Sequence, residues 1–294
     1  MSLYLVRYGE LGLKSPQVKK RFQKALKLNI EDAFLKENIQ CITDMDWGRI
    51  YLHTDEDGMA EEILKKIFGV TSFSKVIETS SSMSEICKTA AEFSKQLIPS
   101  GSSFAVRARR TGDHKFTSQE VAAEVGSAVL AANKNITVNL NQPDFEIFVE
   151  VRHNRAFIFS EKILGPGGFP VGTQGRALAL ITDKKSVYAA WLIMKRGCTM
   201  KLVFTGPEAP AYAQKLKEWY IASQPSEIKD GNVLDEVLDA AMKNRAEALV
   251  VGYTLNEFEK EPRFEAEIPV FYPLIGMSKK EIEEGITFLF GDGS

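Results

Sequence analysis

Hydrophobic and polar positions in the first 75 residues form two strand patterns, each joined to a helical pattern. Proline is favoured in the first turn of a helix, so a helix is expected to begin near Pro16. A strand, a helix, a strand and a second helix in so short a stretch are typical of a small α+β unit of ferredoxin-like type, expected over residues 1–75. The predicted elements are strands at Leu3–Tyr8 and Arg49–His53, and a second helix at Met59–Phe68, closed by Gly69.

The second stretch, expected as a domain over residues 76–165, follows a polar break at Ser80–Ser82. Thr117 and Glu120 have the spacing of a capping box, which marks the start of a helix. The strand at Phe104–Arg110 alternates between apolar and basic side chains, so one of its faces is cationic. The other predicted elements are a helix at Met83–Leu97 and strands at Thr137–Leu140, Glu146–Arg152 and Ala156–Glu161.

From residue 177 to 294, strand and helix patterns alternate, and this predicts a parallel sheet covered by helices. Ligands of such sheets bind beyond the carboxyl ends of the strands, so the turns after Ile181 and Val251 are where chemistry is expected. The preceding glycine-rich stretch, Gly165–Gly175, lacks the spacing and the following helix of a dinucleotide loop, which favours an interdomain linker at 166–176. The predicted elements are strands Ala177–Ile181, Met200–Phe204 and Ala248–Val251, and helices Ser186–Arg196, Ala211–Tyr220, Val233–Arg245 and one capped by Ser278.

Composition describes an ordinary folded chain of two or three domains, with 44% hydrophobic and 26% charged residues among 294. Three widely spaced cysteines exclude a disulfide scaffold and a zinc ribbon, and three separated histidines give no reason to expect a metal. No apolar run has the roughly 18 residues of a membrane span, and the N-terminus lacks a signal sequence. We therefore expect a cytoplasmic protein with no membrane partner.

Charge is unevenly distributed, although the formal net charge is only -2. Residues 11–30 carry six basic side chains and no acid. The usual fate of such lysines is a solvated surface. Two separate basic elements, however, lie in domains that, by the family resemblance given next, look like RNA-binding modules, and this favours contacts with RNA phosphates. The candidate RNA-binding residues are Lys14, Lys20, Lys24, Lys27, Arg107, Arg109, Arg110 and Lys115.

Several motifs, in their order along the chain, resemble the tRNA 4-thiouridine synthetase (tRNA sulfurtransferase) family. The first domain carries RYGELGLKS at residues 7–15, GRI at 48–50 and FGVTSF at 68–73. FTS at 116–118, NQPD at 141–144 and EVR at 150–152 look like the THUMP domain of those enzymes. GGFPVGT at 167–173, MKRG at 194–197 and PLIGM at 273–277 look like the flanks of their Rossmann-like PP-loop pyrophosphatase domain.

The resemblance implies a tRNA-binding protein. In that family the first two domains hold the acceptor stem of tRNA, with little base readout expected because the major groove of duplex RNA is narrow and deep. The third domain uses ATP to adenylate a uridine before sulfur replaces its oxygen. For the catalytic sulfur chemistry, Cys198 is the cysteine available in the third stretch, and it reads as a small buried hydrophobe at the start of a strand.

The phosphate loop departs from the family pattern S-G-G-x-D-S. Its aligned residues are Ile181-Thr182-Asp183-Lys184-Lys185-Ser186, so only the last serine is kept. Adjacent glycines let backbone amides wrap a pyrophosphate, whereas Asp183 brings a carboxylate to the same place. The simpler interpretation is that Asp183 caps the following helix and the lysines are solvated. The residues expected in this vestigial pocket are Leu180, Thr182, Asp183, Lys184, Lys185, Ser186 and Gly252.

Two hypotheses remain open from the sequence. In the first, the protein binds tRNA, takes no cofactor and is not itself an enzyme, acting as a homodimer or with a partner sulfurtransferase. In the second, it is an active tRNA sulfurtransferase that holds ATP and Mg²⁺ through an altered loop. The loss of the glycines favours the first.

Overall fold

The computed structural model describes residues 1–9, 15–46, 48–220, 225–228, 233–260, 264 and 266–291, and divides them between two compact units. The first unit comprises residues 1–7, 40–57 and 72–163. The second comprises residues 8–39, 58–71 and 164–294. Residues 1–75, expected as one continuous domain, therefore contribute to both units.

The first unit is built on one long mixed sheet with the strand order β2-β3-β1-β4-β8-β7-β5-β6. Strand β1 pairs antiparallel with β3, and β4 pairs antiparallel with β8, whereas β5 runs parallel to β7. The strands are β1 (Ser2–Tyr8), β2 (Cys41–Asp46), β3 (Arg49–Thr54), β4 (Val70–Ser80), β5 (Ser103–Thr111), β6 (Thr137–Val138), β7 (Phe145–Arg152), β8 (Arg155–Phe159) and β9 (Ile163–Leu164), which pairs with β4.

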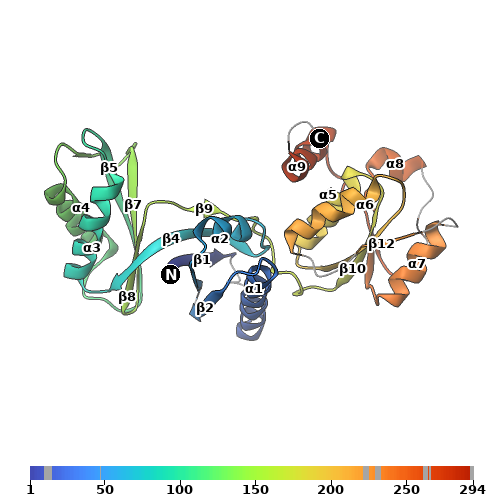
Figure 1. Cartoon of the computed structure of the whole chain (residues 1–294), viewed down its shortest axis with the longest axis horizontal. Helices are drawn as coiled ribbons and strands as arrows, with labels where there is room; N and C mark the ends of the chain where they lie inside the picture. The colour runs from blue at the N-terminus through green and yellow to red at the C-terminus, as the bar shows by residue number, and fades with distance from the viewer. Residues whose placement is uncertain are drawn as a thin grey trace. The chain divides into compact units, whose positions relative to one another are not determined.

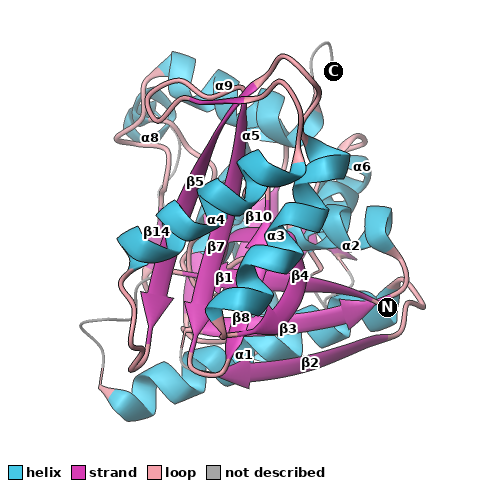
Figure 2. Ribbon diagram, turned by 90° about the vertical axis from the view of Figure 1, so that its left-hand side faces the viewer, coloured by secondary structure: helices cyan, strands magenta, loops and turns pink. Residues whose placement is uncertain are grey.

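Two helices cover one face of strands β5, β7 and β8 (Figure 2). Helix α3 (Met83–Leu97) matches its predicted bounds, and α4 (Ser118–Ala132) begins at the predicted capping box of Thr117 and Glu120. Their apolar stripes bury the inward residues of the strands, among them Val106, Val149 and Ile158. Because side chains alternate along a strand, Arg107 and Arg109 of β5 lie on the opposite face.

Strands β2 and β4 were not predicted from the sequence. The β2 sequence, CITDMD, carries two aspartates, and in β4 the apolar residues are interrupted by serines, so neither has the simple alternation of a half-buried strand. Helix α2 (Asp57–Leu64) ends five residues before Gly69, so the expectation that Gly69 ends this helix is wrong. The φ angle of Gly69 is +101°, but the residue serves the turn into β4.

The second unit contains the predicted parallel sheet, in the order β12-β11-β10-β13-β14. Its strands are β10 (Arg176–Ile181), β11 (Thr199–Phe204), β12 (Ser226–Glu227), β13 (Ala248–Val250) and β14 (Val270–Phe271). Its helices are α1 (Pro16–Lys36), α2 apart from its first residue, α5 (Lys184–Lys195), α6 (Ala209–Lys215) with a 3₁₀ turn at Leu216–Trp219, α7 (Val233–Lys243), α8 (Leu255–Lys260) and α9 (Lys279–Phe290).

Helices pack on both faces of this sheet, with α5 and α7 on opposite sides (Figure 1). One face carries Ala177, Ala179 and Ile181 against α5, α6 and α9. The other face carries Leu178 and Leu180 against α7. This arrangement confirms the predicted helix-covered parallel sheet. Among the described residues, the structure contains no helix that is both long and apolar enough to span a bilayer.

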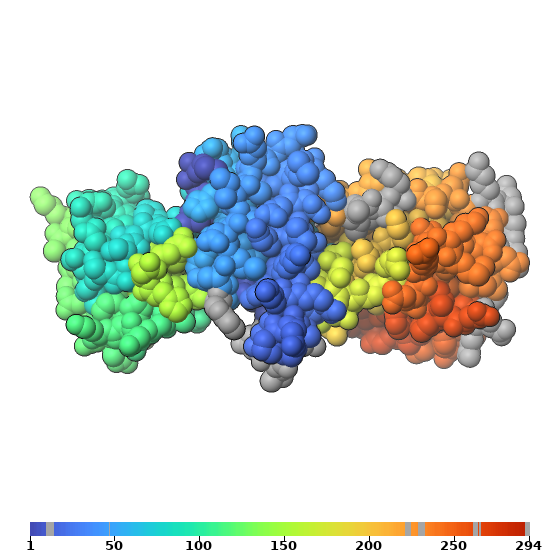
Figure 3. All heavy atoms as spheres, turned by 90° about the horizontal axis from the view of Figure 1, so that it is seen from below, coloured from blue at the N-terminus to red at the C-terminus, as the bar shows by residue number. Residues whose placement is uncertain are grey.

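The glycine-rich stretch predicted as a linker is held in place by close contacts within the second unit. Figure 3 shows its atoms, in yellow, lying against the blue atoms of α1. Arg21 of α1 donates to the carbonyl of Thr173 at 3.0 Å, and the ring centroids of Phe22 and Phe169 lie 5.5 Å apart. Gly168 has a φ of +76°, and a Cβ there would lie 2.2 Å from the Lys195 carbonyl oxygen, so only glycine fits.

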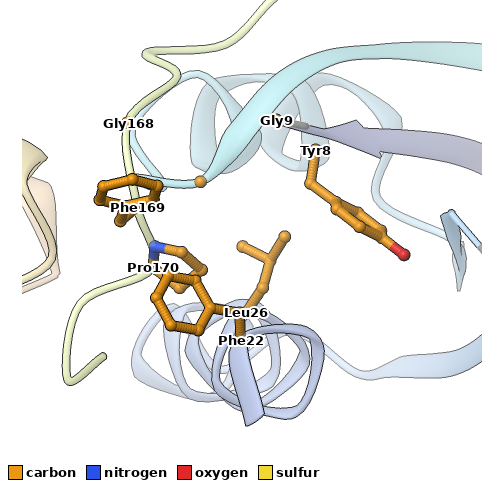
Figure 4. A pocket seen from close by; sticks show the side chains of 8 residues that line it. Tyr8, Gly9, Phe22, Leu26, Gly168, Phe169 and Pro170 are labelled. Carbon is orange, nitrogen blue, oxygen red and sulfur yellow. The ribbon is translucent and has the colours of Figure 1, made fainter. Parts of the chain in front are cut away.

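A small apolar cavity of about 60 Å³ lies where this stretch meets α1 (Figure 4). Phe22 and Leu26 of α1 face Phe169 and Pro170 across it. A space of this size takes a few water molecules at most, so it is not a substrate site.

Candidate nucleic-acid interface and the loop of the parallel sheet

The first unit contains a cleft of about 640 Å³ over the face of β5, β7 and β8 that carries Arg107, Phe148 and Phe159, and the first turns of α4 also line it. Four cationic side chains line it: Arg7 of β1, Arg107 and Arg109 of β5, and Lys162 beyond β8. Two carboxylates, those of Glu146 and Glu150, also face it. The cleft therefore has an excess of positive charge.

Arg107 and Arg109 share this face but differ in their partners. The guanidinium of Arg107 forms a 2.6 Å ion pair with Glu146 and donates to the Leu140 carbonyl at 2.8 Å. Arg109 is exposed and has no hydrogen-bond or ion-pair partner among the residues that the structure describes. Of the two arginines that the sequence predicted as equivalent, Arg109 is the one with its donors available to an anion.

A column of cations and aromatic rings forms one wall of the cleft. The Lys162 ammonium lies 3.7 Å from the centroid of the Phe148 ring, and Phe148 stacks on Phe159 with centroids 5.2 Å apart. Arg7 lies over Phe159, with its guanidinium carbon 4.8 Å from that centroid. Contacts of this kind stabilise a cation at a ring face while leaving its charge uncompensated.

The pKa shifts in the cleft show the crowding of positive charge. Partial burial lowers the pKa of Lys162, and the charges of Arg7 and Arg109 lower it further against the opposing carboxylates. Burial also lowers the pKa of Arg7, and Arg49 and Arg109 act in the same direction while Glu150 opposes them. Cations that repel one another in a concave site produce the potential that an anion would relieve.

The other predicted RNA-binding residues lie on the surface of the protein, except for Lys14, which is outside the residues that the structure describes. Arg110 donates to the Gly112 carbonyl at 3.0 Å, and Lys115 is exposed on the following loop. Lys20 and Lys24 are exposed on α1 in the second unit, and Lys27 pairs with Glu31 at 3.2 Å. The structure thus brings Arg107 and Arg109 together in one cleft, and Lys20, Lys24 and Lys27 together on one helix.

Sequence reasoning missed Arg7 and Lys162 as members of the cleft. Arg7 stands in a strand whose alternation predicts only burial, and Lys162 follows the end of β8 in a short polar segment. The available signal was Phe148, whose register opposite Arg107 on β7 puts an aromatic ring beside the cationic face. This signal becomes visible only once the pairing of β5 with β7 is known, because the pairing places Phe148 opposite Arg107.

The loop after β10 in the second unit is closed by its own hydrogen bonds. The amides of Thr182 and Asp183 both donate to the hydroxyl oxygen of Ser186, at 2.9 and 3.1 Å. The Ser186 amide donates to the Asp183 carboxylate at 2.8 Å, and the Ser186 hydroxyl donates to the Asp183 carbonyl at 2.6 Å. This confirms the predicted capping role of Asp183 at the start of α5.

Lys185 is held on the same loop by two carboxylates. Its ammonium contacts Glu257 of α8 and lies 3.4 Å from Asp183. Burial lowers the pKa of Lys185, but the hydrogen bond to Glu257 and the charges of Asp183 and Glu257 outweigh it and raise that pKa overall. Lys185 is therefore a paired cation, and the predicted solvated lysine is Lys184, whose ammonium lies 5.6 Å from the Phe290 ring centroid.

Gly252, after β13, packs directly against this loop. A Cβ at Gly252 would lie 2.5 Å from the Cα of Ser186, so the two backbones are in contact. Leu180 is buried on the α7 face of the sheet rather than at the loop. Cys198 is half-buried at the amino end of β11, and burial raises the pKa of its thiol, with Glu247 adding to the effect. A thiol of raised pKa is a poor nucleophile.

Two family models match most of the first 161 residues of the chain. Residues 3–74 match the ThiI ferredoxin-like domain, and residues 80–161 match the THUMP domain. A probable tRNA sulfurtransferase of Methanobrevibacter smithii is 35% identical over 95% of this chain and 84% of its own length. The chain belongs to the tRNA sulfurtransferase family. Another family member, the probable tRNA sulfurtransferase of Methanothermobacter thermautotrophicus, is also 35% identical, over 95% of this chain and 82% of that protein.

Solved structures agree with this family assignment and with the predicted fold class. The structure of PH1313 from Pyrococcus horikoshii has a TM-score of 0.82 and 30% identity, covering 97% of this chain and 98% of that one. A 4-thiouridine synthetase–RNA complex with bound ATP also has a TM-score of 0.82, with 26% identity, covering 99% of this chain and 85% of that one. The ferredoxin-like, THUMP and parallel-sheet parts are thus the family's own.

Proposed function

We propose that the protein binds tRNA through its basic surfaces and that its parallel-sheet domain does not hold the phosphates of ATP. The observation that carries the second half is the hydrogen-bonding of the loop after β10. A pyrophosphate site needs backbone amides that point outward, and here the Thr182 and Asp183 amides already donate to Ser186. The serine hydroxyl thus accepts the two hydrogen bonds that a phosphate oxygen would need.

The surrounding charges agree with this reading of the loop. Asp183 sets a carboxylate beside the amides, and Glu257 adds a second one 2.9 Å from the Thr254 amide. Lys185 is engaged by both carboxylates, so it is not available to a phosphate. Displacing these contacts would leave the ligand facing two negative charges, which opposes the binding of a triphosphate.

The tRNA half of the proposal rests on the cleft of the first unit and on the THUMP match over residues 80–161, which contain Arg107 and Arg109 but not Arg7 or Lys162. Arg109 offers planar guanidinium donors suited to a phosphate, and Lys162 offers a point charge. Relatives named tRNA sulfurtransferase, and a solved family structure that contains RNA, support RNA as the anion. We further propose that the domains lie at 1–75, 76–165 and 177–294, and that the acceptor stem is the part bound.

Calorimetry and a tRNA-binding assay test the two halves separately. We expect no binding heat with ATP and Mg²⁺ at submillimolar concentrations, and a salt-sensitive rise in anisotropy with fluorescently labelled tRNA. Replacing Thr182 and Asp183 with glycine tests whether this loop excludes the ligand, since it removes the cap and one carboxylate. Submillimolar affinity for ATP in the unaltered protein would overturn the first half, and indifference to tRNA in low salt would overturn the second.

One alternative is supported by a specific observation. The 4-thiouridine synthetase with bound ATP covers nearly this entire chain, which favours an active, ATP-dependent tRNA uridine sulfurtransferase with an altered loop. The same calorimetry decides between the two proposals. Formation of 4-thiouridine in tRNA supplied with ATP, Mg²⁺ and a sulfur donor would establish the alternative.

A further inference from the structure

A buried carboxylate lies behind the cationic column of the cleft. Glu150 of β7 is 6% exposed, and its two oxygens serve three arginines. Oε2 lies 3.5 Å from Arg7, whereas Oε1 lies 2.8 Å from Arg49 and 3.3 Å from Arg152. Burying a carboxylate costs desolvation free energy, and here the three neighbouring arginines compensate its negative charge.

Arg7 links this carboxylate to the cleft. Its guanidinium is held by Glu150 on one side and donates to the hydroxyl of Ser74 at 3.0 Å. Its flat face lies over Phe159, which stacks on Phe148, and Phe148 lies beneath the ammonium of Lys162. The chain of contacts therefore runs from a fixed carboxylate through one cation and two rings to the exposed cation.

We propose that Glu150 is a positioning residue for RNA binding: through Arg7 and the Phe159–Phe148 stack, it fixes the place of the Lys162 ammonium in the cleft. This inference rests on the proposed binding of tRNA. Glu150 lines the cleft but is only 6% exposed, and its oxygens are engaged by Arg7, Arg49 and Arg152, so it acts on a ligand through these cations. Its removal would let Arg7 leave the Phe159 face, and the stack that carries Lys162 would lose its support.

A double-mutant cycle separates positioning from a general effect of charge or folding. Glu150→Gln and Lys162→Gln are each expected to weaken tRNA binding about tenfold, and the double variant no more than either alone. The slope of log K against log salt should fall by about 0.7 to 0.9, the value of one phosphate contact, in all three variants. Effects that multiply in the double variant would overturn the proposal.

Two further variants control for folding and for charge. Glu146→Gln removes the other carboxylate of the cleft, which pairs with Arg107 and does not contact Arg7, so it should leave the Lys162 contribution intact. If Glu150→Gln fails to fold, Ser74→Ala loosens the same guanidinium without stranding a buried charge. Ser74→Ala is expected to weaken tRNA binding, as Glu150→Gln does. In a protein that already carries Lys162→Gln, it should cause no further loss of affinity.

A spectroscopic readout works without RNA. After reductive ¹³C-methylation of the lysines, the Lys162 methyl signal, assigned by its loss in Lys162→Arg, should be shifted upfield by the Phe148 ring. Glu150→Gln or Ser74→Ala should move it towards the exposed lysines, and Glu146→Gln should not. An unchanged signal in both variants overturns the positioning role. If the unaltered protein does not bind tRNA, the proposed function fails, yet this signal still decides whether Glu150 holds Lys162 in place.

Discussion

The cleft of the first unit and the loop after β10 both collect positive groups, but they differ in how these groups are compensated. In the cleft, Arg109 lacks a partner among the described residues, and the Lys162 ammonium rests on a ring. At the loop, the amides of Thr182 and Asp183 and the ammonium of Lys185 all have acceptors from the chain itself. Donors left open indicate an anion site, and donors closed by neighbours indicate a structural turn.

Charge reversal in the cleft is the most direct test of whether its uncompensated cations bind tRNA. Arg109→Glu together with Lys162→Glu replaces two cations with two carboxylates, and tRNA affinity should fall by about 100-fold or more at low salt. Fluorescence anisotropy with labelled tRNA measures the loss, and circular dichroism checks the fold. Lys88→Glu, on the exposed side of α3, is the matched control and should change affinity little. Equal losses in both variants would mean that the cleft has no special role.

Much of the fold could be predicted because local signals agree with it. Capping boxes at Thr117 and Ser278, and the aspartate cap at Asp183, fix the starts of three helices by contacts within four residues. The alternating strands and helices after residue 176 predict the parallel sheet for the same reason. Strands β2 and β4 escaped prediction because their place depends on partners far along the chain, such as β3 and β8.

The candidate site was predictable only in part, because it depends on contacts between residues that are far apart in the sequence. Arg107 and Arg109 look alike in the sequence, yet Glu146 pairs with Arg107 and leaves Arg109 open. Arg7 lies 155 positions before Lys162, and the two meet through the rings of Phe159 and Phe148. The loss of the loop glycines was visible in the sequence. The hydrogen bonds that Ser186 accepts from the amides of Thr182 and Asp183 were not.

A stability measurement sharpens the loop side of the comparison. Gly252→Ala places a Cβ 2.5 Å from the Cα of Ser186, so the turn after β13 and the start of α5 must separate. We expect a loss of about 1 to 3 kcal/mol in the free energy of unfolding, measured by urea denaturation. Gly276→Ala is the control, because nothing lies within 4 Å of its added Cβ. A neutral Gly252→Ala would show that the loop has room beside Ser186, as an open ligand site requires.

The smallest expected effect is the loss of stability on removal of the ion pair between Lys185 and Glu257 at the loop after β10. Burial raises the pKa of Glu257, but hydrogen bonds from Lys185 and Thr254 outweigh it and lower that pKa below its usual value. A carboxyl with a lowered pKa in the folded state adds stability above its unfolded pKa of about 4.3, and loses it as the pH falls through the folded value. Because the contact is partly exposed, Glu257→Gln should cost only up to about 1 kcal/mol at pH 7.

The difference in melting temperature between the unaltered protein and Glu257→Gln should therefore shrink below about pH 4, as Glu257 of the unaltered protein takes up a proton. Glu283→Gln, whose partner Lys279 is 90% exposed on α9, is the control and should show a smaller difference at every pH. A Glu257→Gln difference that does not change with pH would mean that Lys185 is not held by a charge on Glu257. Its ammonium would then be open to a phosphate, and the loop would resemble the cleft after all.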